Sequence, residues 1–379
     1  MLNALHGLIG WAPLGLPAFV FVVTVVVFFH ELGHFSVARF FNVTVDTFSI
    51  GFGRPVAQWV DKKSTRWKIG WLPLGGYVKF LGDENAASQH DRELYERLPP
   101  ELRANTLQGK PLYQRVLIVA AGPFANFILT IVIFTFIFMI VGPATLLTTV
   151  GQVMPKSPAA IAGLRTGDTI TSVNGHAVAT FDDLVLTVRA AKAGDLAIEY
   201  TRHGSSQIAH LHAGSVATSN LYGDHIHYTG IGIGALLADS NARFTPAGPL
   251  AAVGLASQET VGIMQTSLTY LWRIVTGQSG ANQLSGTVGI ANASKQAASA
   301  GFTSLFQLIA LISVSIGLIN LFPVPILDGG HLLYYGCEAI LGRPLGERAQ
   351  DVGFRLGLAL VLGLFVLAAW NDLTRLNLF

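Results

Sequence analysis

Residues 16–38 read LPAFVFVVTVVVFFHELGHFSVA, and this stretch decides the class of protein. Leu16 to Phe29 are apolar apart from Thr24, so the run can cross a bilayer as an α-helix. On that helix His30 and His34 project from one face and can bind one metal ion, with Glu31 as a candidate base for water. Ionisable groups at membrane depth are costly unless they face a cavity, a partner or a metal. This cost favours a metal site over two histidines bonded only to backbone or water.

Composition agrees with membrane embedding. The 379 residues are 51% hydrophobic and 12% charged, whereas a soluble domain carries about a quarter charged residues. The net charge of +2 predicts no nucleic-acid partner, and a single cysteine excludes an intramolecular disulfide. No Lys or Arg precedes Arg39, so the first apolar run lacks the basic region of a secretory signal and is expected to be retained.

Four stretches approach the roughly 20 apolar residues that a span needs, at about 16–38, 116–141, 305–322 and 354–370. Of the 24 Lys and Arg residues, twelve lie between Arg39 and Arg115. Cytoplasmic loops near spans are enriched in these residues. The 39–115 segment is therefore predicted to be cytoplasmic. Both termini and the 143–303 segment are predicted to lie outside, and the histidines at the cytoplasmic end of the first span.

The predicted fold is a polytopic α-helical membrane protein with four transmembrane helices and two additions. Residues 1–142 form the N-terminal membrane part, and residues 304–379 form the C-terminal one. The cytoplasmic stretch at about 45–80 is extended and aromatic-rich. It predicts a β-hairpin or sheet that dips into the membrane and whose edge pairs with substrate; the alternative is an ordinary cytoplasmic loop.

An outside module is predicted over residues 143–240, where short apolar runs alternate with turn signals. The pattern indicates short β-strands with one helix near Phe181 to Ala191. Residues 241–303 are expected to form an extracytoplasmic or interfacial amphipathic segment, with a helix over Pro249 to Val275.

Two histidines are too few for a catalytic zinc site, which usually has three protein ligands. Asp328, His331 and Glu338 are the candidates for the third ligand. If the first and third spans pack side by side, Asp328 lies level with His34. Another polar residue, Asn126, follows Gly122-Pro123 at the start of the second span. We expect these residues either to kink the helix near the site or, with slightly more support, to adjust helix packing.

Longer motifs then give a family resemblance. His30-Glu-Leu-Gly-His34 together with Asn320-Leu-Phe-Pro-Val-Pro-Ile-Leu-Asp-Gly-Gly-His331 resembles the site-2 protease family of intramembrane zinc metalloproteases, in the branch of the regulator of sigma E protease. The stretches 73–80, 114–126 and 284–290 support the resemblance, which covers most of the chain in the order of the family. Thr287 stands where the family usually has proline.

The stretch 157–175 resembles a bacterial, circularly permuted PDZ domain, so the predicted module is an α/β PDZ domain. This chain has one such module where the best-known members have two, which puts in doubt any gating scheme that needs tandem domains. Gly230, Ile231, Gly232 and Ile233 look like the loop that holds the C-terminal carboxylate of a peptide, although an ordinary β-turn is the alternative.

The resemblance implies that His30, His34 and Asp328 bind Zn²⁺, that Glu31 activates water and that Asn320 holds the substrate or its oxyanion. His331 is expected to hydrogen-bond to groups around the zinc ligands or to the backbone instead of binding zinc. The β-rich loop suggests further substrate contacts at Gly75, Gly76, Tyr77 and Val78.

The expected activity is cleavage of single-pass membrane proteins after a first cut outside, in regulated intramembrane proteolysis at the bacterial inner membrane. The resemblance implies anti-sigma factors and signal-peptide remnants as substrates, with peptide C-termini at the PDZ domain and the lipid bilayer as further partners. Two alternatives are a non-catalytic membrane PDZ scaffold, disfavoured by the intact His30, Glu31, His34 and Asp328, and a zinc transporter, which would need ligands at several depths.

Overall fold

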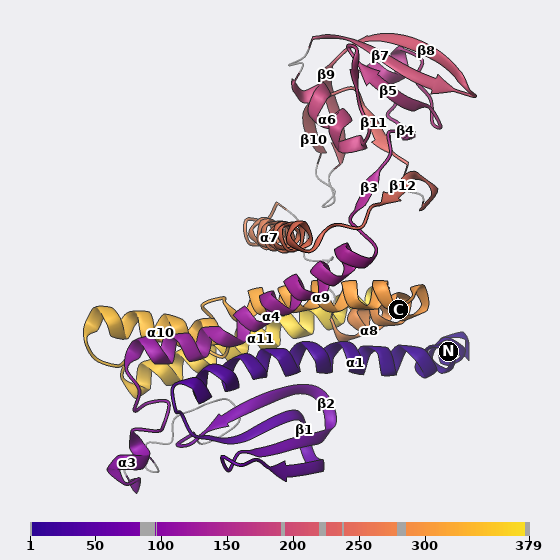
Figure 1. Ribbon diagram of the computed structural model, residues 1–379. Helices are drawn as coiled ribbons and strands as arrows, with labels where there is room; N and C mark the ends of the chain where they lie inside the picture. Colours follow the sequence, from indigo (N-terminus) through magenta and orange to yellow (C-terminus); the bar gives the residue numbers. More distant parts are fainter. Residues whose placement is uncertain are drawn as a thin grey trace. The chain divides into compact units, whose positions relative to one another are not determined.

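The fold is taken from a computed structural model (Figure 1) that describes residues 2–83, 95, 97–190, 194–219, 225–236, 239–278 and 286–375. The chain divides into two compact units. The membrane unit comprises residues 1–135, 253–269 and 280–379, and the second unit comprises residues 136–252 and 270–279. Each unit is described separately below.

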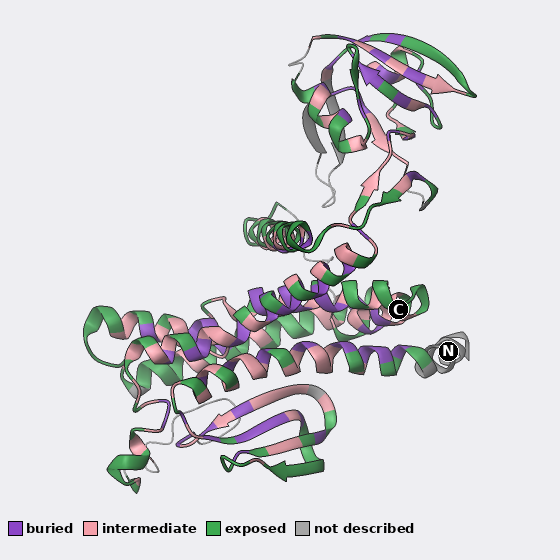
Figure 2. Cartoon of the chain, viewed as in Figure 1, coloured by how far each residue is buried: buried purple, intermediate pink, exposed green. Residues whose placement is uncertain are grey.

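Four helices are long and apolar enough to cross a membrane, among the residues described. They are α1 (Leu2–Phe40), α4 (Leu112–Ile140), α9 (Phe302–Asn320) and α11 (Glu347–Arg375). The four predicted spans are thereby confirmed as helices; α1 and α11 extend beyond both predicted ends, whereas α4 and α9 begin earlier than predicted and end one and two residues earlier. Exposed residues, green in Figure 2, lie along these helices, and many of them are large and apolar. An apolar exterior on long helices is what a lipid environment requires.

Further helices lie between these four in the described part of the chain. They are α3 (Pro100–Arg103), α7 (Pro249–Val275), α8 (Thr287–Ala300) and α10 (Asp328–Leu341). The predicted helix over Pro249 to Val275 has those same bounds. The α8 helix packs against α1 and α9 and begins after Gly286, which has no side chain to cap it. Instead Asp372 of α11 accepts from the N–H groups of Val288 and Gly289, both at 3.0 Å. A carboxylate at a helix N-terminus stabilises the unpaired N–H groups there.

The predicted β-rich loop is a sheet formed by β1 (Val45–Val60) and β2 (Arg66–Phe80), and it packs against α1 (Figure 1). Residues 47–50 pair with 76–79 on one side and with 66–69 on the other, and residues 57–60 pair with 66–69. The sheet is therefore four segments wide. The 76–80 segment lies at one edge, and no other strand pairs with its outer side among the described residues.

A charged anchor ties this sheet to the end of α1. The Arg39 guanidinium donates to the Asp61 carboxylate and to Thr65 Oγ1, and Thr65 Oγ1 donates to the carbonyl oxygen of Val45 at 2.7 Å. Desolvation raises the pKa of Asp61, but hydrogen bonds from Trp67, from the Thr65 and Lys63 backbone and from Arg39 outweigh it and lower the pKa to about 2. The carboxylate therefore stays charged at neutral pH, and the ion pair fixes the turn between β1 and β2 beside α1.

The second unit is built from short strands and two helices. A four-stranded sheet has the order β6-β5-β7-β8. Its strands are β5 (Thr169–Val173), β6 (His176–Ala177), β7 (Asp195–Arg202) and β8 (Ser205–His212). The helices are α5 (Pro158–Ile161) and α6 (Phe181–Ala190), so the helix predicted near Phe181 to Ala191 is confirmed.

Three further strand pairs belong to this unit. They are β3 (Ala144–Leu146) with β12 (Ala242–Phe244), β4 (Val150–Val153) with β11 (Ile233–Ala235), and β9 (Gly214–Ser219) with β10 (His225–Gly230). A short 3₁₀ helix spans Asp239–Asn241. The core is apolar: Leu184 and Val188 of α6 pack with Leu196 and Ile198 of β7 and with Val150. The alternation of buried and exposed residues along β7 places one face of the sheet on this core.

Candidate metal centre

Three donor atoms from two distant parts of the sequence meet inside the membrane unit. Nε2 of His30 lies 3.2 Å from Oδ2 of Asp328, and Nε2 of His34 lies 3.4 Å from the same oxygen. The two Nε2 atoms are 3.3 Å apart. Both histidines are buried, with exposures of 8% and 9%. Two imidazoles and one carboxylate that converge in this way form a donor set suited to zinc.

The position of His34 depends on close contact between α1 and α4. A Cβ added to Gly122 would lie 2.2 Å from Nε2 of His34, so only glycine leaves room for this imidazole. A Cβ on Gly33 would lie 2.3 Å from the carbonyl oxygen of Ala121. Nδ1 of His34 donates to the carbonyl oxygen of Ile118 at 2.9 Å. A carbonyl can only accept, so the proton is on Nδ1 and the lone pair of Nε2 faces the donor cluster.

His30 has a different neighbour at its outer nitrogen. Nδ2 of Asn126, on α4, is 3.3 Å from Nδ1 of His30, and Asn126 is completely buried. Asn320, the last residue of α9, places its Nδ2 3.3 Å from Nε2 of His30. The sequence motif therefore gives a site in which each histidine is also contacted from another helix.

Asp328 is positioned by a tight return of the chain between α9 and α10. It occupies the first turn of α10, and the two glycines after it have no space for a side chain. A Cβ on Gly329 would lie 2.2 Å from the carbonyl oxygen of Phe322, and one on Gly330 would lie 2.3 Å from that of Val324. Close backbone contact of this kind requires glycine, which explains the Asp-Gly-Gly sequence.

The charges at the centre favour an ionised Asp328. Burial raises the pKa of its carboxyl, but His34 and His30 beside it lower the pKa more, and the net result is well below the usual range. Its Oδ2 atom is buried, and among the described residues it faces only the two imidazole nitrogens. An anionic oxygen that faces only imidazole nitrogens is the arrangement that a bound cation would satisfy.

Glu31 lies beside the cluster and next to the edge of the sheet. Its carboxylate interacts electrostatically with His30, His34 and Asp328, and the backbone of Val78 hydrogen-bonds to it. A Cβ on Gly76 would lie 2.8 Å from Cγ1 of Val27 and 3.2 Å from Cγ of Glu31. The 76–80 edge segment therefore runs directly past the candidate base.

The other residues expected at this edge are in the same segment or beside it. Gly75 has a φ of 131°, which favours glycine, and a Cβ there would lie 2.5 Å from the Phe52 ring. The Tyr77 ring stacks on Phe52, with centroids 6.1 Å apart. These contacts shape the turn that leads into the edge segment.

The two other candidates for the third ligand do not join the donor cluster. Glu338 forms a two-pronged ion pair with Arg115, in which Nη1 donates to Oε2 at 3.0 Å. The Arg115 guanidinium also lies over the Tyr335 ring, 5.0 Å from its centroid. His331 is one turn beyond Asp328, and its ring meets Tyr334 edge-on at 6.5 Å. Burial lowers the pKa of His331, which keeps its imidazole neutral.

Sequence reasoning missed two features of this site. Asn126 was expected to kink or pack the second span, yet it contacts His30, and Gly122 makes room for His34. Arg115 was not connected with Glu338, 223 positions away. A polar residue in an apolar span was the available signal for Asn126. Nothing in a single sequence pairs Arg115 with Glu338.

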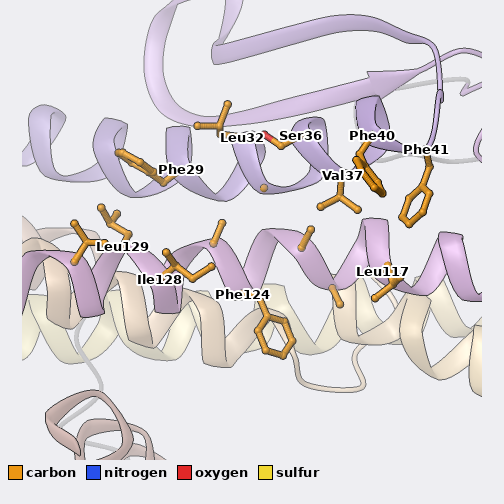
Figure 3. Close-up of a pocket in the computed structure, with 15 residues that line it drawn as sticks. Phe29, Leu32, Ser36, Val37, Phe40, Phe41, Leu117, Phe124, Ile128 and Leu129 are labelled. Atoms are coloured by element: carbon orange, nitrogen blue, oxygen red, sulfur yellow. The ribbon is translucent and has the colours of Figure 1, made fainter. Parts of the chain in front are cut away.

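An apolar groove of about 730 Å³ lies on a neighbouring face of the same two helices (Figure 3). Phe29, Val37 and Phe40 of α1 face Leu117 and Ile128 of α4 across it. His30, Glu31 and His34 do not line this groove, so it is separate from the donor cluster.

In the second unit, the predicted carboxylate-binding loop connects β10 and β11. Gly232 has a φ of 79°. The carbonyl oxygens of Ile231 and Gly232 accept from the N–H groups of Ala159 and Met154, both at 2.9 Å. The loop is thus held by the segment around α5, with Gly230 to Gly232 buried.

Comparison with known proteins finds relatives over nearly the whole chain. The model of "Peptidase family M50" matches residues 18–364. "Putative zinc metalloprotease Atu1380" of Agrobacterium fabrum is 42% identical over 358 residues, which cover 94% of this chain and 95% of that protein. "Metalloprotease MmpA" of Caulobacter vibrioides is 39% identical over 391 residues, 96% of each chain.

Among solved structures, the PDZ domain of an SdrC-like protein from Listeria monocytogenes is 26% identical, covering 23% of this chain and 85% of that one. Its TM-score is 0.19, which is too low to assign a fold.

Proposed function

The chain belongs to peptidase family M50 and is a zinc metalloendopeptidase of the membrane, and from this premise we propose that it cuts single-pass transmembrane proteins within or near the bilayer. The observation that carries the proposal is the position of the donor cluster. His30 and His34 follow an apolar run on a helix long enough to span a membrane, and Asp328 meets them there. A protease centre at that depth suits a substrate that is itself in the membrane.

We propose His30, His34 and Asp328 as the zinc ligands. The fit is supported by the buried Oδ2 of Asp328, which faces only imidazole nitrogens among the described residues, and by the lone pair of His34 Nε2. Three protein ligands leave a position open for water or substrate. Bound zinc supplies Lewis-acid chemistry, which lowers the pKa of water toward ~7 and polarises a carbonyl group.

The remaining steps are assigned to side chains at the same place. Glu31 takes the proton of the attacking water and then delivers it to the nitrogen of the leaving amine. Asn320 Nδ2, which reaches the cluster beside His30, donates to the oxyanion that develops on the scissile carbonyl. Both roles need only groups that already lie around the donor cluster.

A transmembrane helix hides its peptide bonds, so the substrate has to unwind locally before it can be cut. Unwound backbone in a membrane needs new hydrogen-bond partners. The 76–80 edge segment offers them, because its outer side has no pairing strand among the described residues and it passes Glu31. We assign Gly75, Gly76, Tyr77 and Val78 to this role, in which the substrate adds a strand to the sheet.

Anti-sigma factors and signal-peptide remnants are the proposed substrate classes, cut after a first extracytoplasmic cleavage at the bacterial inner membrane. The Lys and Arg distribution supports a site toward the cytoplasm, with both termini and residues 143–240 outside. The latter segment is proposed to be a PDZ domain that binds peptide C-termini through residues 230–233 or excludes substrates with bulky outside domains.

The test is cleavage of a single-pass substrate by the purified protein in detergent, with zinc content measured on the same sample. Glu31→Gln should retain stoichiometric zinc and lose about 10²–10⁴-fold in cleavage rate, the usual contribution of a general base. Cleavage at the wild-type rate by a zinc-loaded Glu31→Gln protein would refute the mechanism. Proline substitutions at the outward-facing N–H positions of the 76–80 edge segment should raise the KM, and unchanged cleavage would exclude strand addition.

A further inference from the structure

The two histidines of the donor cluster differ in what contacts their outer nitrogens. Nδ1 of His34 meets the backbone carbonyl of Ile118, which can only accept a hydrogen bond. Nδ1 of His30 meets the side-chain amide of Asn126, which can donate through Nδ2 or accept through Oδ1. His34 is thus held in one tautomer, whereas the tautomer of His30 depends on which way the amide faces.

Asn126 is held in place so that only its amide can turn. The residue is completely buried, and its backbone carbonyl accepts from Thr130 Oγ1 at 3.0 Å and from Ser313 Oγ at 2.9 Å. A Cβ on Gly317 of α9 would lie 3.2 Å from Cβ of Asn126, so α9 closes that side. Oδ1 of Asn126 is buried and has no hydrogen-bond donor. A buried amide oxygen without a donor is costly, and Nδ1–H of His30 is the group within reach of a half-turn of the amide.

We propose that Asn126 is a positioning residue that sets the tautomer of His30 for metal binding. In the arrangement described, Asn126 Nδ2 donates to Nδ1, and the proton of His30 is on Nε2, which faces Asp328 Oδ2 at 3.2 Å. When Nε2 gives its lone pair to a metal, the ring proton is on Nδ1 and donates to Oδ1 of the turned amide. No proton is gained or lost by the ring, and the buried oxygen gains its donor. The inference rests on the proposed ligand set.

The expected size of the effect follows from other metal sites. Partners of the outer nitrogen of a ligating histidine are typically worth about 10–100-fold in metal affinity. Asn126→Leu keeps the approximate volume but cannot accept, and it should weaken zinc binding by about that factor. Asn126→Asp accepts at both oxygens and should bind zinc at least as tightly as the wild type.

The experiment measures zinc affinity of the full chain in detergent by competition with a chromophoric chelator, and the visible absorption of the cobalt(II)-loaded protein. The control is Asp372→Ala in α11, which removes a buried carboxylate whose hydrogen bonds go to Val288 and Gly289 of α8 and not to either histidine or to Asn126. The control should lower thermal stability and leave the zinc affinity and the cobalt spectrum unchanged.

Weaker zinc binding in Asn126→Leu, with affinity kept in Asn126→Asp, supports the proposal. Equal weakening in both variants, or no change in either, overturns it. If Asn126→Leu does not fold, Asn126→Asp decides: affinity below that of the wild type overturns the proposal. Asp328→Ala separates the two hypotheses, because unchanged zinc affinity in that variant refutes the ligand set itself.

Discussion

The membrane unit and the second unit differ in the polar groups that they bury. In the membrane unit the buried polar side chains, including His30, His34 and Asn126, are enclosed by helices whose outer faces are apolar. In the second unit the interior is an apolar cluster around Leu184 and Ile198, and the buried carboxylate of Asp168 is paired with Arg202. The difference follows from the surroundings, because lipid accepts apolar surface and water accepts charge.

This contrast implies different sources of stability. Helices in lipid gain little from burying apolar side chains against one another, so close packing and interhelical hydrogen bonds hold them together. The glycine contacts of Gly33, Gly122 and Gly317 and the hydroxyl bonds of Thr130 and Ser313 are of that kind. The second unit has an apolar core like that of a water-soluble domain and is expected to be stabilised chiefly by burial of that core. Substitutions of matched type should therefore have different effects in the two units.

The largest stability effect is expected at the ion pair of Arg115 and Glu338. Arg115→Ala leaves a partly buried carboxylate, 16% exposed, without its partner; a fully buried unpaired charge costs about 3–5 kcal/mol, which is the upper limit here. The thermal unfolding midpoint in detergent should fall sharply. The double change Arg115→Met with Glu338→Leu should restore most of the loss, because apolar replacement of a buried pair is often neutral. If the unfolding midpoint of the double variant stayed as low as that of Arg115→Ala, the pair would stabilise the unit by more than the neutralisation of its two charges.

Removing core volume from the second unit should come next. Leu184 is 1% exposed within the apolar cluster, and Leu184→Ala should cost about 2–5 kcal/mol. Hydrogen exchange of the full chain should show faster exchange in β5, β7 and α6, and zinc content should stay stoichiometric. Loss of zinc in this variant would mean that the two units are not independent in stability.

Much of the architecture could be predicted from the sequence, since long apolar runs report directly on helices of membrane length. The run before His30 predicts α1, and Phe181 to Ala191 has a helical pattern that the structure confirms as α6. The meeting of Asp328 with His34 was also predictable, because both residues were expected at the same end of adjacent spans. In each of these cases the signal is local or follows from membrane geometry.

The contacts that tune the site could not be predicted in the same way. Asn126 reaches His30 only because α4 approaches α1 closely at Gly122, and helix contacts of this kind depend on rotation about the helix axis. The pairing of residues 47–50 with two segments of β2 depends on register, which the alternating pattern leaves open. The sequence identifies the reactive groups, but the packing decides which neighbours orient them.

Two buried threonines, one in each unit, allow the units to be compared through a smaller effect on stability. Thr130 in α4 donates to the carbonyl of Ala310, and Thr148 in the second unit donates to that of Ile170. Interhelical hydrogen bonds in membranes average about 0.6 kcal/mol, whereas a buried bond in a water-exposed domain is worth about 1 kcal/mol. Thr130→Val should therefore destabilise its unit less than Thr148→Val destabilises its own, as measured by local hydrogen-exchange protection. The reverse order would contradict the proposed difference.

The smallest effect is pH-dependent and belongs to the second unit. Burial raises the pKa of Asp168, but hydrogen bonds and positive charge lower it by more, so the net pKa is below the usual value. The Arg202 guanidinium donates to Oδ1 at 2.7 Å and to Oδ2 at 2.8 Å, and the Arg165 N–H also donates to Oδ2. A carboxyl with a lowered folded-state pKa adds stability above its unfolded pKa of about 3.9, and this is lost as the pH falls through the folded value. Asp168→Asn should thus reduce protection of the β5 and β7 amides at pH 7, and the difference from wild type should shrink toward pH 3. If the difference between Asp168→Asn and the wild type were the same at every pH in this range, Asp168 would act through hydrogen bonds that the asparagine side chain does not make, and not through its charge.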